Sequence, residues 1–179
     1  MRRITDFLRR APRRDIVRDQ SGVAAIEFAL ISTAMFAMLS GAVDLTQAIT
    51  IQRDLNRVAA EIAQVLAACP KEDCVDRTIQ SILARRGNIA PNLPTMQLGM
   101  ARFKEVNNQI DGNSMGGTMT FLPPDMNTRA LALLANDDSG IAVLATYTHQ
   151  PIILGLADDW GFTTKNFRAP VVTIRLRAS

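Results

Sequence analysis

The stretch from Gly22 to Val43, GVAAIEFALISTAMFAMLSGAV, constrains this chain more than any other part of it. From Val23 to Val43 it holds 21 residues and only one charged side chain, Glu27. At a rise of ~1.5 Å per residue, a helix of that length spans ~31 Å, about one hydrocarbon core of a bilayer. The stretch therefore predicts a membrane-spanning helix. Its carboxylate is unusual, because an ionised acid in lipid costs about 2.5 kcal/mol or more.

Charge is distributed unevenly along the chain. Residues 1–20 carry seven arginines and three aspartates, whereas the remaining residues carry 13 basic and 14 acidic side chains. A basic segment next to an apolar span is typical of a cytoplasmic N-terminus, and it would place everything after Val43 outside the cytoplasm. The overall pI of about 9.3 therefore reflects this basic segment, and we expect no nucleic-acid partner.

A short motif lies at the start of the apolar run, where Gly22 is followed five residues later by Glu27 and then by Phe28. Gly-x-x-x-x-Glu-Phe at the cytoplasmic edge of an apolar helix resembles the processing site of type IV prepilins. Within that family, QSGVAAIEFALI is most similar to the TadE/TadF-type pseudopilins (minor pilins) of the tight-adherence (Tad, Flp) pilus system. The resemblance is strong over about Asp19 to Leu45.

The resemblance implies a processing site and a set of partners. A membrane aspartyl prepilin peptidase would cut between Gly22 and Val23, and the new amine would lie near Glu27 of a neighbouring subunit. The other implied partners are the major Flp pilin, a sibling pseudopilin, the Tad inner-membrane platform with its ATPase, and membrane lipid. Ala37 and Gly41 are four residues apart and would let another helix approach closely.

The resemblance also implies a location and an order of segments. The protein would be a single-pass protein of the bacterial inner membrane with a cytoplasmic N-terminus and a periplasmic C-terminal domain, and it would enter a pilus or a priming complex. The expected segments are a basic leader (1–22), a transmembrane helix (23–43), a periplasmic continuation of the helix (44–68) and a periplasmic α+β domain (69–179). Asp44 would reach water at the far end of the span.

Two other interpretations of the N-terminal half fit less well. A cleaved secretory signal is disfavoured because the apolar run is over-long and no good small-x-small site follows it closely. Leu66-Ala67-Ala68-Cys69 matches a lipoprotein box, but Arg57 and Glu61 separate it from any apolar run that would serve as a signal.

The helix should continue beyond the membrane, because neither proline nor glycine occurs between Gly41 and Cys69. Apolar residues recur there at steps of four and three, which predicts one buried stripe: Ile51, Leu55, Val58, Ile62 and Val65. Pro70 ends the helix. Its first half suits lipid and bundling with other subunits, and its second half suits packing on a globular domain.

After Pro70 the pattern predicts an α+β domain with a mainly antiparallel sheet and one or two short helices. Helices are expected over Glu72–Arg86 and from Pro123 and Pro124 to about Asn136, and a turn-rich connection over Asn88–Pro94. Loops are expected over Asn107–Gly117, where Asp-Gly favours a hairpin turn, and over Asp158–Asn166. Strands are expected over Gln97–Val106, Thr118–Leu122, Ile141–Thr148 and Val171–Arg177, and Pro151–Leu156 would extend the sheet.

Few residues carry recognisable chemistry. Cys69 and Cys74 are the only cysteines, and outside the cytoplasm a disulfide is the leading interpretation. Free structural thiols and a redox or metal role are the alternatives. The single histidine, His149, lies near no nucleophile motif, and the acidic pairs Asp137-Asp138 and Asp158-Asp159 lack the spacing of a calcium loop.

Three function classes remain from the sequence. The first is a structural and assembly protein, a TadE-like minor pilin of a surface-adhesion pilus that performs no chemistry itself. The second is an uncleaved bitopic membrane protein whose periplasmic domain binds a partner. The third is an anchored periplasmic enzyme, which the lack of a catalytic constellation disfavours. We expect no catalytic residue, cofactor or metal.

Overall fold

The computed structural model describes residues 20–151 and 164–175, except for the side chains at 20, 21, 113 and 114. The chain divides into two units, Met1–Gly41 and Ala42–Ser179, which we call unit 1 and unit 2. The division falls inside the longest helix, α1, which runs over Gln20–Ala67 without a break. The predicted helix from Val23 to Ala68 is therefore confirmed, with its start three residues earlier.

Unit 1 presents the apolar half of α1 with its large side chains exposed. Phe28, Phe36, Met38 and Leu39 are 64–77% exposed. This helix is long and apolar enough to cross a membrane, and none of its 18-residue apolar window is buried by the chain. The described part of unit 1 thus contains an apolar helix and no core of its own.

Unit 2 begins with the second half of α1, which buries one stripe in a hydrophobic core. Leu55, Val58 and Ile62 are 0–7% exposed, as the periodicity predicts. Val65 was assigned to the wrong face: it is 55% exposed, and Leu66 is fully buried instead. The stripe advances by four residues from Ile62 rather than by three, and both steps are compatible with a 3.6-residue repeat.

Two short helices follow the end of α1. Helix α2 spans Glu72–Ala84 and buries Val75 and Ile79, while its Ile82 and Leu83 pack at the edge of the same core. It ends two residues before the predicted Arg86, because Arg85 leaves helical geometry with φ −107° and ψ 8°. A single turn, α3, then runs over Arg86–Ile89.

Four strands form one antiparallel sheet in the order β2-β1-β3-β4. Their bounds are Gln97–Val106 (β1), Gln109–Gly117 (β2), Ser139–His149 (β3) and Lys165–Ile174 (β4). Strand β4 starts six residues before the predicted Val171 and includes Pro170, which an edge strand tolerates because its free edge needs no donor. The predicted extension over residues 152–156 and the loop over 158–163 lie outside the described residues.

The β1–β2 hairpin was predicted with its turn in the wrong place. The turn consists of Asn107 and Asn108, whose φ angles of 52° and 60° fit a two-residue type I′ turn. Residues 109–117, predicted as a loop, are therefore strand β2, and Thr118–Leu122 is not a strand. Strand β2 ends at Gly117, where φ is +72° and an added Cβ would lie 1.9 Å from the Leu98 carbonyl oxygen.

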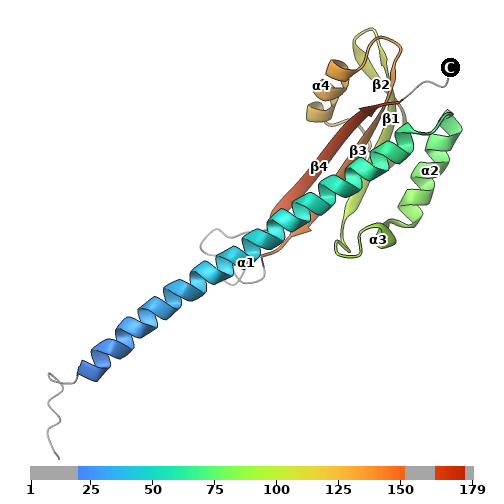
Figure 1. Ribbon diagram of the computed structural model, residues 1–179. Helices are drawn as coiled ribbons and strands as arrows, with labels where there is room; N and C mark the ends of the chain where they lie inside the picture. Colours follow the sequence, from blue (N-terminus) through green and yellow to red (C-terminus); the bar gives the residue numbers. More distant parts are fainter. Residues whose placement is uncertain (1–19, 152–163, 176–179) are drawn as a thin grey trace, which may run out of the picture. The chain divides into compact units, whose positions relative to one another are not determined.

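The sheet has a core on each face. The second half of α1 and helix α2 cover one face (Figure 1). Gln52 Nε2 of α1 donates to the Arg168 carbonyl oxygen of β4 at 3.1 Å. Helix α4, Pro124–Leu133, packs on the other face with Met126 and Ala130 buried. A long N-terminal helix followed by a small antiparallel sheet with short helices is the predicted α+β architecture, so the fold class is confirmed.

Candidate assembly site

The predicted processing residues lie in the first three turns of α1. Since α1 begins at Gln20, Gly22 is already helical, and a Cβ added to it would meet no atom within 4 Å. Val23 is 57% exposed, Phe28 is 73% exposed, and Glu27 is also exposed. The packing of the described residues therefore does not require glycine at position 22, and Val23, Glu27 and Phe28 are exposed.

The predicted helix-packing residues lie further along the same half of α1. Ala37 is exposed and Gly41 is half-buried, and a Cβ added to Gly41 would also meet nothing within 4 Å. Small residues at this spacing allow close approach of helix backbones. The described chain leaves this surface open for such an approach.

The two cysteines form a disulfide, as predicted. Cys69 lies just after the end of α1 and Cys74 lies in the first turn of α2, with their Cα atoms 5.6 Å apart. The guanidinium of Arg175 supports the same corner: its Nε donates to the Cys69 carbonyl oxygen at 3.2 Å and its Nη2 to the Pro70 carbonyl oxygen at 2.9 Å. The disulfide and Arg175 thus tie the exit of α1 to both α2 and the end of the sheet.

An ion pair between a buried arginine and an exposed glutamate links the sheet to α2, and the sequence analysis missed it. The Arg102 side chain is 9% exposed, and its Nη1 lies 2.9 Å from Glu72 Oε1. Its Nε lies 3.9 Å from Asp76 Oδ1. The alternation of β1 was a usable signal, because residues i and i+2 of a strand share a face, so that Arg102 follows Met100 toward the helices.

Asp44 contradicts the expectation that it would reach water. It is only 5% exposed, in the first turn of unit 2, and it takes part in an interaction with the rest of the chain. A buried charge is costly unless it is paired or hydrogen-bonded, so a position just beyond the span does not by itself mean solvation. Unit 2 shelters this carboxylate from its surroundings.

The remaining polar candidates behave as parts of the fold. Asp137 Oδ1 pairs with Lys104 Nζ at 2.7 Å, and Asp138 Oδ2 accepts from the Ala135 amide at 3.1 Å. Among the described residues, no three His, Cys, Asp or Glu side chains are placed to hold a metal ion. His149 is 8% exposed, its ring lies 6.1 Å from that of Phe167, and no described group hydrogen-bonds its Nε2.

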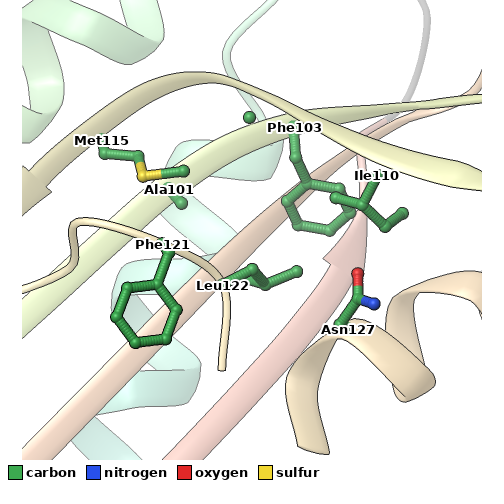
Figure 2. A pocket seen from close by; sticks show the side chains of 8 residues that line it. Ala101, Phe103, Ile110, Met115, Phe121, Leu122 and Asn127 are labelled. Atoms are coloured by element: carbon green, nitrogen blue, oxygen red, sulfur yellow. The ribbon is translucent and has the colours of Figure 1, made fainter. Parts of the chain in front are cut away.

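A small apolar pocket lies on the α4 side of the sheet. Its volume is about 270 Å³, and Figure 2 shows Phe103 and Ile110 lining it from the hairpin and Phe121 and Leu122 from the segment before α4. Among the eight described lining residues Asn127 has the one polar side chain, and Phe121 is 67% exposed. The lining residues carry no titratable side chain, so this pocket offers no acid–base chemistry.

Fold and surface together define a class: a long N-terminal helix that is apolar enough to span a membrane, joined to a small antiparallel α+β domain. The family described as TadE-like protein matches the chain over residues 22–64. The predicted TadE-like resemblance is therefore confirmed over most of α1, including the Gly22-to-Phe28 motif. No curated protein and no solved structure matches the chain.

Proposed function

We propose that this protein is a minor pilin of a Tad pilus, cut between Gly22 and Val23 by a prepilin peptidase and then assembled with other pilins. The observation that supports this most strongly is the first half of α1, whose large apolar side chains and motif residues are all left exposed by the chain. The similarity of residues 22–64 to the TadE-like family supports the proposal. Such a surface suits lipid before assembly and other helices after it.

Glu27 gives the proposal a physical mechanism. An ionised carboxylate that is unpaired in lipid costs at least ~2.5 kcal/mol. Cleavage after Gly22 would create a positive amine on Val23, and on a neighbouring helix shifted by about one turn that amine would neutralise Glu27. Pairing would therefore favour assembly in one axial register, while the close approach of helices would use Ala37 and Gly41.

The charge distribution and the disulfide support a cellular location for each part of the chain. The seven arginines before Gln20 favour a cytoplasmic N-terminus, and unit 2 with its disulfide suits an oxidising periplasm. The proposed partners are the prepilin peptidase, the major Flp pilin, a sibling pseudopilin and the Tad inner-membrane platform. We propose that the protein performs no chemistry itself.

Replacing Gly22 by leucine tests the processing step. Cleavage requires the residue before the cut to fit the peptidase, so Gly22→Leu should leave an uncut precursor ~22 residues longer than the mature protein. The mature wild-type protein should have an N-terminal sequence that begins at Val23. Gly41→Leu is the matched control, since both glycines lie in α1 with open space around them. A wild-type N-terminus at position 1, or cleavage of Gly22→Leu as complete as in the control, would instead support the uncleaved bitopic protein.

A further inference from the structure

The outer face of α1 stays apolar beyond the predicted end of the span. Leu45 is 62% exposed and Ile49 is 46% exposed, although both belong to unit 2, which has its own core. They are four residues apart and therefore lie on one face of the helix. A soluble domain does not need two large aliphatic side chains on the outside of a helix that already buries another stripe.

Charge is absent from the accessible surface over the same length. From Phe28 to Gln52 the only ionisable side chain is Asp44, and it is buried. The first exposed charge is Arg53, the next residue of the stripe that contains Leu45 and Ile49. This stripe therefore changes from aliphatic to cationic between Ile49 and Arg53.

The threonine hydroxyl groups around Leu45 and Ile49 are bonded within α1. Thr46 Oγ1 donates to the Ala42 carbonyl oxygen at 2.8 Å, and Thr50 Oγ1 donates to the Thr46 carbonyl oxygen at 2.9 Å. Thr33 and Ser40, inside the apolar run, make the same bond to the residue four positions earlier. Such bonds to the helix's own backbone are compatible with a medium that offers no hydrogen-bond partner.

We infer that the lipid-facing surface of α1 continues past Val43 through Leu45 to Ile49, and that this end of unit 2 lies in the headgroup layer of the bilayer. Along the helix axis, Leu45 is ~3 Å and Ile49 ~9 Å beyond Val43. The headgroup layer adds ~5–8 Å to each side of the hydrocarbon core. Leu45 therefore lies within this layer and Ile49 lies at its outer boundary. Arg53, ~15 Å beyond Val43, lies in the water outside the layer, where its charge is solvated.

Lipid fits this surface better than a partner helix does. Helices that pack on one another in membranes favour small residues at the contact, whereas the exposed positions here are a leucine and an isoleucine. The threonine hydroxyls are already bonded within α1 and need no group from a neighbour. Because Asp44 is buried, its carboxylate does not present a charge to lipid beside Leu45.

Site-directed spin labels distinguish lipid, water and protein at these positions. Leu45→Cys and Ile49→Cys are each labelled in the full chain reconstituted in phosphatidylethanolamine–phosphatidylglycerol vesicles at a low protein-to-lipid ratio. Because Cys69 and Cys74 are bonded to each other, the introduced thiol is the reactive one. Collision rates with oxygen, which concentrates in lipid, and with a water-soluble nickel chelate are then compared.

Phe36→Cys and Gln64→Cys serve as the lipid and water references, since both residues are exposed. The oxygen-to-nickel ratio should fall in the order Phe36, Leu45, Ile49, Gln64, with both test positions clearly above Gln64. Ratios at Leu45 and Ile49 equal to that at Gln64 would overturn the inference, as would shielding of both from both reagents, which would indicate a second helix. The inference depends on the membrane location in the proposed function, and a Phe36 label that is not oxygen-accessible would overturn both.

Discussion

The two halves of α1 both carry large aliphatic side chains, but only the second half buries them within the chain. Leu39 in unit 1 is 64% exposed, whereas Leu55 in unit 2 is fully buried, although both are leucines of one continuous helix. The burial of Leu55 is explained by the core that α1 shares with the sheet. Nothing within the described chain explains the hydrophobicity around Leu39, so that half must be adapted to something outside the chain.

Because of this difference, we expect substitutions in the two halves of α1 to affect different properties, stability in one half and assembly in the other. Substitutions in the second half of α1 should change the free energy of unfolding of unit 2. Substitutions in the first half should leave that free energy unchanged and alter contacts with lipid or with other pilins. Each prediction below compares a change on one side of this division with a change on the other, in order of decreasing effect on stability.

The largest effect is expected from Leu55→Ala. Removing a fully buried leucine side chain from a packed core costs about 2–5 kcal/mol, because transfer energy is lost and a cavity remains. Leu39→Ala, the matched change in unit 1, should shift the free energy of unfolding by no more than about 0.5 kcal/mol. Both variants are compared with the wild type by chemical unfolding of the full chain in detergent, followed by far-ultraviolet circular dichroism.

Equal destabilisation by Leu55→Ala and Leu39→Ala would contradict the expected difference between the two halves of α1. It would mean that the first half of α1 contributes to the stability of unit 2 as much as the second half does. Val65→Ala sharpens the same test within unit 2, because Val65 is exposed and its neighbour Leu66 is buried. Val65→Ala should behave like Leu39→Ala.

The disulfide should have the next largest effect. A bond that closes the short loop between Cys69 and Cys74 contributes about 2 kcal/mol by constraining the unfolded chain. The double variant Cys69→Ser, Cys74→Ser should lose this stability, and reductant should destabilise the wild type and leave the double variant unchanged. Complete thiol labelling of both cysteines in membranes, without prior reduction, would contradict the pairing.

The sequence predicted those features that depend on local pattern. The long helix follows from an uninterrupted run of helix-compatible residues, and β1 was predicted with its exact bounds over Gln97–Val106. The disulfide followed from two cysteines at a helix end. The TadE-like motif from Gly22 to Phe28 was recognisable because it depends on a short spacing in the chain and not on tertiary contacts.

Features that depend on tertiary contacts were missed or misplaced. The glycines of β2 indicated a loop, but Gly116 belongs to the strand. A glycine fits this position because α2 packs close to it: an added Cβ would lie 2.6 Å from Ile79 Cγ2. Asp44 was expected in water because periodicity does not show which side of α1 the rest of unit 2 covers. The partners of Arg102, Glu72 and Asp76, lie on another element and are 26–30 positions away in sequence.

The smallest effect on stability, and a clear effect on assembly, is expected from Glu27→Gln. Glu27 is exposed in unit 1 and makes no described contact with unit 2, so the free energy of unfolding of unit 2 should not change. The amide cannot provide the negative charge that would pair with the amine of Val23 on a neighbouring subunit. We therefore expect normal insertion and cleavage, reduced co-purification with the other pilins, and loss of surface pili.

Glu61→Gln is the matched control for Glu27→Gln. Glu61 is an exposed glutamate of the same helix in unit 2, and it pairs with Arg57 at 2.7 Å, a bond that raises the pKa of Arg57 above its usual value. An exposed pair of this kind contributes little to stability, and Arg57 stays charged in either case, so Glu61→Gln should leave both unfolding and piliation as in the wild type. If Glu27→Gln co-purifies with its partner pilins at the level of Glu61→Gln and forms normal pili, then the charge in unit 1 has no role in assembly, and the first half of α1 acts only as a membrane anchor.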